Sequence, residues 1–479
     1  MDETLKNQVD LSEEYGDEYM MVPVPMEKRR SLWKQIWVWV GFGYAVTGLL
    51  VGGSLAGSGG VGMPFGPAMW SVVIGMGLLF ILTSMLGVIT MTTGMNLALV
   101  TRYSYGSKGF IIPAGVMFIL TLAWFGQLTG MVGDFWALML GNPTGVIVFT
   151  PANIGFPHVD PITLEFFIVC IAWGAIFTIT AARGVGAIEK VATWLTPALA
   201  LSGFIALFAW LSEMGGFGAV AESARDISGL GFGHAVTIVV GSWIVGCYMG
   251  TELFRFNKNV RDVVLCAGAC FIVTNPMLMV VGYLGWIHLA EPNYMSVMLG
   301  MGVVFAFIAV LLWTISLWTT NNAELYCNAL YTGPTLKNIF GRYVSRKTLV
   351  IVAGIIGTVI AALAFFQLFF HAFVGILGAI APPVVAPLLA DFYIIRGKKP
   401  EKYSDKVLNE QPGVRWAGIV SGLGGMFFGF IFQYVAPLPW GLPSGVAALI
   451  LGIIIYVIVY QFAPDSANDD RLVEKAKSS

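Results

Sequence analysis

Charged residues are scarce in this chain. Asp, Glu, Lys and Arg make up only 11% of its 479 residues, whereas a soluble globular protein carries about 25%. Hydrophobic residues reach 57% and aromatic residues 13%, so the composition also excludes a disordered chain and a nucleic-acid-binding surface. We conclude that lipid, rather than water, surrounds most of the protein.

Residues that build catalytic and metal centres are also few. The four histidines are scattered and form no HExxH motif, and the sequence has neither a P-loop nor a GxSxG motif. The five cysteines lie in apolar stretches without metal-ligand spacing, which indicates small buried side chains: Cys170, Cys247, Cys266, Cys270 and Cys327. The sequence therefore predicts no enzyme and no cofactor, and a carrier driven by an ion gradient is the remaining function class.

Apolar segments of about 20 residues, the length of a membrane-spanning helix, recur along the whole chain. Their number predicts an all-α integral membrane protein with 12 transmembrane helices. The expected spans are 35–58, 66–92, 109–138, 162–181, 188–212, 233–250, 263–290, 298–328, 348–370, 372–395, 415–435 and 441–462.

Basic residues test this arrangement, because Lys and Arg in short loops favour the cytoplasmic side. With a cytoplasmic N-terminus, all 26 basic residues except Arg225 fall in cytoplasmic segments. Both termini are therefore predicted to be cytoplasmic. The first 20 residues are acidic and polar, so we expect no cleavable signal peptide. Residues 1–30 and 464–479 are predicted to be solvated tails, on either side of a transporter domain at 31–463.

Glycines interrupt the first and the sixth spans. The first contains Gly41, Gly43 and Gly48, and the sixth contains Gly241 and Gly246. Glycine weakens a helix, and paired broken helices five spans apart are typical of transporters built from two inverted repeats. We expect a first repeat at 35–212, a second at 233–395 and two extra helices at 415–462. The alternative is that the glycines only allow close helix packing.

A run of polar residues in the eighth span indicates a binding site. Ser316, Thr320 and Glu324 recur every four residues on one helix face, and Thr319 lies beside them. Their oxygens are the hard ligands that suit Na⁺. The alternative, Ser and Thr bonding to the preceding helical turn, does not explain Glu324 or the adjacent pair of asparagines. An ionisable group within a membrane is a functional candidate by default.

The third span carries a second candidate pair. Trp124 and Gln127 are three residues apart and face one way. A flat apolar indole beside an amide suits a planar, hydrogen-bonding heterocycle, although a tryptophan in mid-helix is often only a packing residue. Near the ends of spans six and ten, Glu252 with Arg255 and Asp391 with Arg396 are interpreted as structural ion pairs.

Several motifs occur in the order of a known family: Val22-Pro23, Arg29-Arg30, Thr101-Arg102-Tyr103-Ser104-Tyr105-Gly106, Trp124-Phe125-Gly126, Val240-Gly241-Ser242, Phe254-Arg255-Phe256, Trp318-Thr319-Thr320-Asn321, Ile380-Ala381-Pro382-Pro383 and Ala390-Asp391. On these motifs the chain resembles the nucleobase:cation symporter family (purine/cytosine permease type), and within it the cytosine permease-like branch, over nearly all of residues 22–460.

The resemblance implies a leucine-transporter-like fold, with a 5+5 inverted repeat plus two C-terminal helices, and uptake of a nucleobase-like solute with Na⁺ or H⁺. It also implies that Trp124 and Trp243 sandwich the solute and that Ser242 hydrogen-bonds it. The implied Na⁺ site consists of the carbonyls of Gly41, Tyr44 and Ser316 with the hydroxyls of Thr319 and Thr320.

The chain departs from the cytosine permease pattern at the implied solute site. Thr121 stands where Gln is typical, Val245 where Ser is typical and Ser316 where Asn is typical, while Trp243 replaces Phe and Glu324 is unusual. These changes suggest a larger or a cationic planar solute.

The sequence therefore predicts a monomeric importer of the inner (cytoplasmic) membrane, which moves a cytosine- or purine-like ring by Na⁺ symport through alternating access. One alternative is an amino-acid or amine carrier of the same fold, with Glu324 holding an ammonium group. A solute-binding receptor or a channel is the other.

Overall fold

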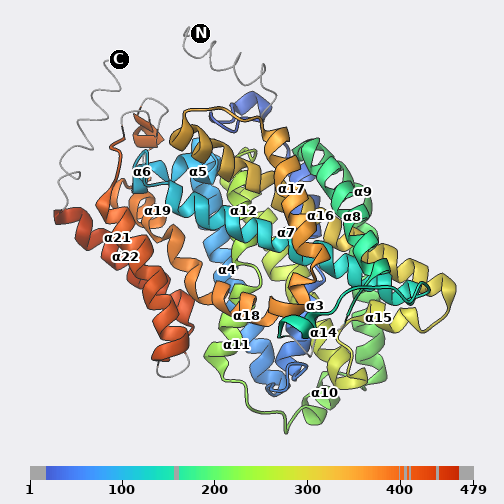
Figure 1. Cartoon of the computed structure of the whole chain (residues 1–479). Coiled ribbons are helices and arrows are strands. Elements are labelled where there is room, and N and C mark those ends of the chain that lie inside the picture. The colour runs from blue at the N-terminus through green and yellow to red at the C-terminus, as the bar shows by residue number, and fades with distance from the viewer. Residues whose placement is uncertain are drawn as a thin grey trace.

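Long helices run through most of the computed structural model, which describes residues 18–155, 161–398, 400–403, 407–408, 411–438 and 442–462 (Figure 1). Among these residues, eleven helices are long and apolar enough to cross a membrane. A twelfth predicted span is also helical, as α17 (Arg346–Ala362), and its 17 residues stand at the short end of the range that spans a bilayer. The prediction of an all-α membrane protein is confirmed.

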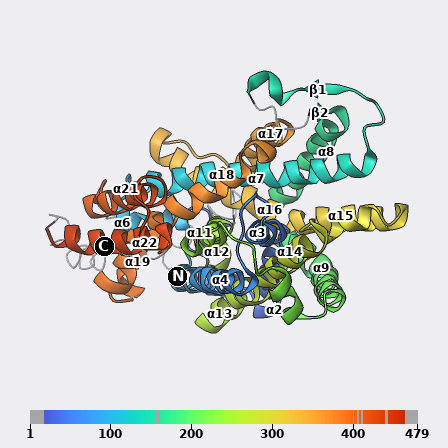
Figure 2. The same cartoon turned by 90° about the horizontal axis from the view of Figure 1, so that it is seen from below.

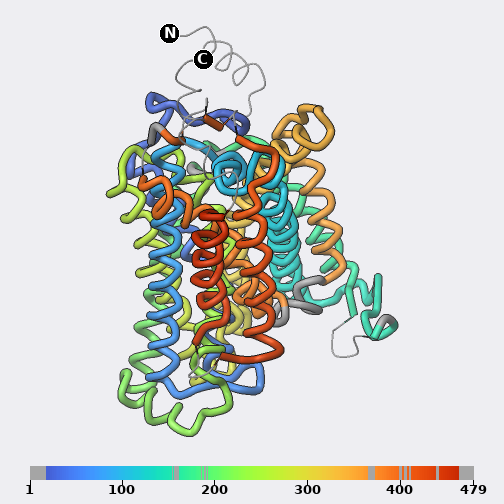
Figure 3. The backbone as a smooth tube through the Cα atoms, turned by 90° about the vertical axis from the view of Figure 1, so that its left-hand side faces the viewer, coloured from blue at the N-terminus to red at the C-terminus, as the bar shows by residue number. Residues whose placement is uncertain are grey.

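The continuous spans overlap their predicted positions, although the eighth continues to Phe340, well beyond the predicted end at 328. They are α4 (Phe65–Thr93), α7 (Ile111–Leu140), α8 (Leu164–Ala182), α9 (Val185–Glu213), α16 (Val303–Phe340), α21 (Trp416–Phe430) and α22 (Ser444–Phe462). A π-helical turn at Ala269–Thr274 joins α13 (Val260–Gly268) to α14 (Asn275–Leu289), and Pro382 and Pro383 separate α18 (Phe365–Ile380) from α19 (Ala386–Ala390). Figure 3 shows these helices running from one end of the structure to the other.

Both predicted helix breaks are present. The first span consists of α2 (Leu32–Gly43) and α3 (Thr47–Ala56), and the sixth of α11 (Phe232–Gly241) and α12 (Ile244–Phe254). The glycines also serve close packing, as the alternative interpretation held, since a Cβ on Gly52 would collide with the backbone of Met279 on α14. The two interpretations therefore apply to different glycines of the same helices.

Short elements join the spans. They are α5 (Leu97–Val100), α6 (Arg102–Tyr105), α10 (Phe217–Ser223), α15 (Tyr294–Leu299) and an antiparallel pair of strands, β1 (Ile147–Phe149) and β2 (Ile162–Thr163). Residues 18–30, α5 and α6 lie at the upper end of Figure 1, and α10 lies at the lower end. Figure 2 shows α21 and α22 side by side at one edge of the bundle, away from β1 and β2.

Large apolar side chains are exposed on the outer helices, for example Trp194 on α9, Val303 on α16 and Phe427 on α21. Such a surface is stable in lipid, where apolar groups need not be withdrawn from water.

Part of the predicted N-terminal tail is wrong. Met20 is only 1% exposed and Val24 only 2%, and Val24 N–H donates to the Gly94 carbonyl at 2.9 Å. Arg30 N–H donates to the Phe256 carbonyl at 2.7 Å. Residues 18–25, 29 and 30 are thus held against the helices, because backbone groups of this segment find partners in loops far away in the sequence, whereas Met26, Glu27 and Lys28 are exposed. Residues 1–17 and the predicted tail at 464–479 lie outside the described residues.

Candidate solute-binding site

A small cavity of about 20 Å³, with room for about one water molecule, lies where the two helix breaks face α7 and α16. Broken helices expose backbone and small residues at mid-span, which is tolerated where they line a cavity. The lining residues are Phe42, Ala45, Thr47, Trp124, Leu128, Ser242, Trp243, Val245, Gly246, Met249, Thr320 and Glu324.

Aromatic rings from both repeats contribute to the wall. Trp124 on α7 is 4% exposed and meets Phe373 edge-on, with ring centroids 5.4 Å apart. Trp243 occupies the break between α11 and α12, is 5% exposed, and lies 6.3 Å from the ring of Phe42. The indole of Trp243 rests on Gly246, where any Cβ atom would collide with it. A glycine one turn along the helix therefore leaves the space that this ring occupies.

The polar residues of α16 form two groups, one that bonds to neighbouring helices and one that lines the cavity. Asn321 donates to the Thr129 hydroxyl on α7 at 2.7 Å, and Asn322 lies 2.7 Å from the Thr180 hydroxyl on α8. These two asparagines join helices. In contrast, the Thr320 hydroxyl and Oε2 of Glu324 are buried without a hydrogen-bond partner, and both residues line the cavity. A buried polar atom without a partner is costly and points to a ligand.

The residues of the predicted cation site lie close together beside the first break. The Ser316 hydroxyl donates to the Tyr44 carbonyl at 2.7 Å, and the Thr319 hydroxyl donates to the Ser316 carbonyl at 3.2 Å. A Cβ atom on Gly41 would lie 3.6 Å from Oγ1 of Thr319. These uncharged carbonyl and hydroxyl oxygens are of the type that hard cations prefer.

Thr196 on α9 is a candidate that the sequence analysis missed. Its hydroxyl is buried without a partner and would lie 2.7 Å from a Cβ atom on Gly41. The sequence contains one signal for this position, since Pro197 directly follows Thr196 and a proline interrupts the hydrogen bonding of a helix interior. The group is thus another oxygen available to a cation at the end of α2.

The predicted solute contacts are distributed as follows. Trp124, Ser242, Trp243, Val245 and Glu324 line the cavity. Thr121, Gln127 and Ser316 do not, and Thr121 instead donates to the Met117 carbonyl at 2.7 Å and accepts from Asn328 at 3.0 Å. Gln127 is buried next to the lining residue Leu128, and neither of its amide atoms has a partner. Contact of Thr121, Gln127 and Ser316 with a solute stays a prediction.

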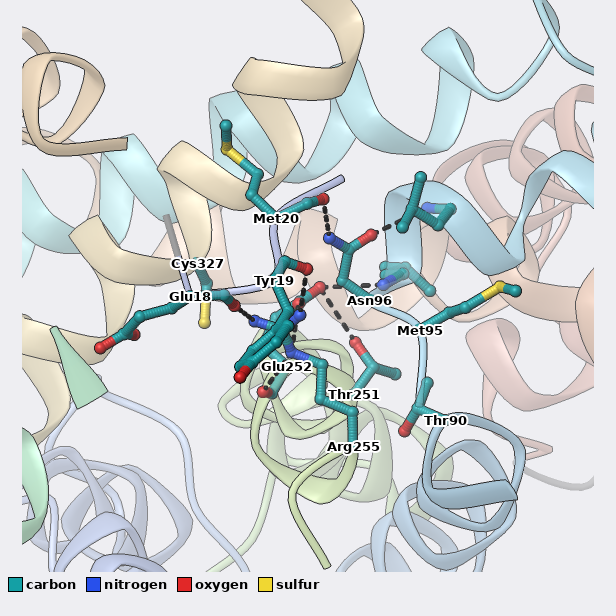
Figure 4. Close-up of polar contacts among 12 residues, drawn as sticks. Glu18, Tyr19, Met20, Thr90, Met95, Asn96, Thr251, Glu252, Arg255 and Cys327 are labelled. Atoms are coloured by element: carbon teal, nitrogen blue, oxygen red, sulfur yellow. Dashed lines mark hydrogen bonds and ion pairs between the residues drawn. The ribbon is translucent and has the colours of Figure 1, made fainter. Parts of the chain in front are cut away.

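Hydrogen bonds join residues 18–20 to α12 and its neighbours, beyond the upper end of the cavity lining (Figure 4). Arg255 lies six residues beyond the lining residue Met249 on α12, which is about 9 Å of helix rise. Its guanidinium is buried and donates to the carbonyls of Tyr19 at 2.7 Å and Glu18 at 2.9 Å, and to the Tyr326 hydroxyl at 3.1 Å. We call this arrangement the upper closure.

Glu252 completes the upper closure. Its carboxylate accepts from Leu97 N–H at 3.0 Å and lies 3.9 Å from the Arg255 guanidinium. Asn96 donates to the Met20 carbonyl at 2.7 Å in the same place. The predicted Glu252–Arg255 pair is confirmed, as is the pair of Asp391 with Arg396 at 2.8 Å.

A second group of bonds holds the first break from another side. The Tyr44 hydroxyl lies 2.9 Å from the Tyr294 hydroxyl on α15, which lies 2.7 Å from the Ser202 hydroxyl on α9. We call these three residues the Tyr44 network. This network joins the first break to α9 and α15. The Tyr44 carbonyl in the same break also accepts from the Ser316 hydroxyl.

Comparison with known proteins identifies relatives over nearly the whole chain. Residues 23–459 match a family described as "Permease for cytosine/purines, uracil, thiamine, allantoin". The cytosine permease of Escherichia coli K12 is 28% identical over 416 residues, which cover 87% of this chain and 90% of that protein. The hydantoin permease of Microbacterium maritypicum is 24% identical over 324 residues, which cover 64% of this chain and 62% of that protein.

Solved structures confirm the fold. Mhp1, a nucleobase-cation-symport-1 family transporter in a closed conformation with bromovinylhydantoin bound, superposes with a TM-score of 0.72 at 18% identity, over 94% of this chain and 98% of that one. Its inward-facing conformation superposes with a TM-score of 0.69, over 94% and 96% of the two chains. The prediction of a leucine-transporter-like fold is confirmed, and the described helices are consistent with the predicted 12 spans.

Proposed function

Since the chain belongs to this family of permeases for cytosine, purines and related solutes, it is a multi-pass membrane transporter of a small molecule, and we propose that it imports a nucleobase-like planar heterocycle together with Na⁺ by alternating access. The observation that carries the proposal is the cavity itself. Aromatic faces from the two repeats, Trp124 and Trp243, enclose it, and unpaired polar groups of α16 point into the same space. Base–aromatic stacking is worth about 1–3 kcal/mol per ring.

The cavity must widen to admit a ring, because it has room for about one water molecule. The breaks at Tyr44 and Trp243 are the segments that can move without disrupting a continuous helix. Binding of the solute between Trp124 and Trp243 then favours a state in which both breaks are ordered.

The co-transported Na⁺ is assigned to the carbonyls of Gly41, Tyr44 and Ser316 and the hydroxyls of Thr319 and Thr320. Two observations support a fit: the Thr320 hydroxyl is buried without a partner, and the Ser316 hydroxyl already holds the Tyr44 carbonyl against α16. Thr320 belongs both to the assigned Na⁺ site and to the cavity lining. Na⁺ and the solute therefore stabilise the same ordered state of the first break, and binding of either one raises the affinity of the protein for the other.

We assign the upper end to the cytoplasm of a cell whose cytoplasmic membrane holds the protein. Basic side chains gather there: Arg29 donates to the Met91 carbonyl, Arg346 to the Ala181 carbonyl and Arg396 to the Tyr103 carbonyl. Lys and Arg favour the cytoplasmic side of a membrane. In this orientation the upper closure must open to release solute inward.

Transport is tested on protein reconstituted into liposomes. We expect at least one radiolabelled planar heterocycle of a set comprising cytosine, hypoxanthine and 2-aminoimidazole to accumulate under an inward Na⁺ gradient, and preloaded unlabelled solute to drive counterflow. Binding without accumulation or counterflow would indicate a receptor and contradict the proposal.

Replacing Thr320 by alanine is expected to weaken the stimulation of uptake by Na⁺, because it removes the unpaired hydroxyl assigned to the ion. The concentration of Na⁺ giving half-maximal uptake should rise about tenfold, the cost of one lost ligand of about 1.4 kcal/mol. Thr335→Ala is the matched control, since that hydroxyl on the same helix donates to the Tyr331 carbonyl at 2.8 Å. An unchanged Na⁺ dependence in Thr320→Ala would remove this residue from the site.

Replacing Gly246 by alanine is expected to weaken solute affinity by about tenfold or more. The new methyl group displaces the indole of Trp243, and overpacking of this kind costs about 1–3 kcal/mol. Titration of the solute against purified protein measures the effect. Gly77→Ala on α4 is the control, because a Cβ atom there meets nothing within 4 Å. Equal affinities in the two variants would show that the Trp243 orientation is not used.

A further inference from the structure

Glu324 is the one ionisable side chain among the residues that line the cavity. It is 3% exposed, and its Oε2 atom has no hydrogen-bond partner. The acidic side chain of the upper closure, Glu252 on α12, is by contrast bonded to Leu97 N–H and placed against Arg255. Glu324 therefore stands apart as an acidic group that the fold itself leaves unsatisfied.

Among the residues that the structure describes, no basic side chain forms an ion pair with Glu324. The ion pairs found within the described part of the chain join Glu222 to Arg225, Glu252 to Arg255, Glu213 to His288 and Asp391 to Arg396. The Arg255 guanidinium is occupied by the carbonyls of Glu18 and Tyr19 and by the Tyr326 hydroxyl. A cation that compensates the Glu324 carboxylate must therefore come from outside the chain.

The rest of the cavity is suited to a cationic ring. Trp124, Trp243 and Phe42 offer three aromatic rings, and the face of an aromatic ring attracts a positive charge as well as a stacked heterocycle. With room for about one water molecule, the cavity offers little water to screen the carboxylate. A neutral ring offers no positive charge to pair directly with this carboxylate, and an anionic ring would be repelled.

We infer that the solute is a planar heterocycle that carries a positive charge at neutral pH, of the amidinium or ammonium type, and that its charged N–H group pairs with Glu324 while its ring lies between Trp124 and Trp243. The inference rests on the proposed function, since it concerns the solute of the same site. It assigns Glu324 the selection of charge and leaves the selection of shape to the aromatic rings.

Matched pairs of ligands test the inference by isothermal titration calorimetry on the purified full-length protein in NaCl. One pair is 5-aminomethyluracil, an ammonium, and 5-hydroxymethyluracil, which is neutral. The other is 2-aminoimidazole, which is protonated at neutral pH, and imidazol-2-one, which is neutral. We expect the cationic member of at least one pair to bind at least tenfold more tightly than its neutral partner.

Glu324→Gln keeps the shape of the side chain and removes its charge. This variant should weaken binding of the preferred cation about 100-fold, as expected for a desolvated charge pair, and leave binding of the neutral partner unchanged or improved. Glu165→Gln on α8 is the control, because that carboxylate is also buried but accepts from Thr144 N–H away from the cavity. It should retain the preference of the parent protein.

The outcomes are separable. Equal or tighter binding of the neutral member in both pairs, or a preference that survives Glu324→Gln, overturns the inference and leaves the proposed function intact. If neither these four compounds nor cytosine and hypoxanthine bind in NaCl, the proposed function fails together with the inference. A folded state of Glu324→Gln is verified independently by its melting temperature and elution volume.

Discussion

An Arg255→Met variant is expected to lose about 3–5 kcal/mol of stability, the cost of breaking a buried ion pair by removing one partner. The substitution keeps the apolar stem of the side chain but removes the charge that faces Glu252. It also leaves the carbonyls of Glu18 and Tyr19 and the hydroxyl of Tyr326 without their donor (Figure 4). Residues 18–20 would then lose their main bond to α12, and the upper closure would open more often.

A native cysteine reports that opening. Cys327 is buried on α16, with its thiol 4.0 Å from the Met249 carbonyl, between the cavity and the upper closure. Peptide mapping after N-ethylmaleimide treatment should show faster labelling of Cys327 in Arg255→Met, while Cys170 on α8 serves as the internal reference. The melting temperature in detergent should fall at the same time.

Arg396→Met provides the matched control for this labelling. Arg396 is another buried arginine at the upper end, but it pairs with Asp391 and donates to the Tyr103 carbonyl rather than to residues 18–20. It should lower the melting temperature without exposing Cys327. Equal labelling of Cys327 in the two variants would mean that general destabilisation, and not the contacts of Arg255, controls access to the cavity from this end.

Replacing Trp124 by alanine is expected to weaken solute binding strongly. It removes one aromatic face of the cavity, and stacking of about 1–3 kcal/mol corresponds to a loss of affinity of roughly 5- to 150-fold. Trp124→Phe, which keeps a smaller ring, should retain part of the affinity.

Thermal-shift titration with the best-binding heterocycle measures the Trp124 variants. Trp70→Ala, which removes an exposed indole from the outer face of α4, is the control and should bind like the parent protein. If Trp124→Ala binds the solute as the parent does, the cavity described here is not the solute site.

The spans and the two helix breaks could be predicted from the sequence because both depend on local properties. A segment of about 20 apolar residues is stable in lipid whatever its neighbours are, and glycines weaken a helix wherever they occur. The breaks after Gly43 and Gly241 therefore fall inside the glycine-rich segments. The position of residues 18–30 could not be predicted, because their backbone groups bond to Gly94, Arg255 and Phe256, which are remote in sequence.

The candidate site shows the same division. Trp124, Trp243 and Glu324 are unusual within apolar helices, and all three line the cavity. Met249 and Leu128 line it too, but an apolar residue in an apolar helix carries no signal of its own. The adjacent asparagines support a binding site in the sequence, but in the structure they join α16 to α7 and α8. Polar side chains that join two helices cannot be distinguished in the sequence from polar side chains that face a ligand.

The most direct test of the account is the binding of planar heterocycles to the purified protein in NaCl and in KCl, measured by thermal shift. The panel comprises cytosine, uracil, hypoxanthine, allantoin and 2-aminoimidazole, with simple alkylamines as the ringless comparison. The account predicts that at least one heterocycle raises the melting temperature in NaCl, and that the shift is much smaller in KCl and in Trp124→Ala. A response to alkylamines alone, or shifts of equal size in the two salts, would contradict a Na⁺-coupled site built on Trp124 and Trp243.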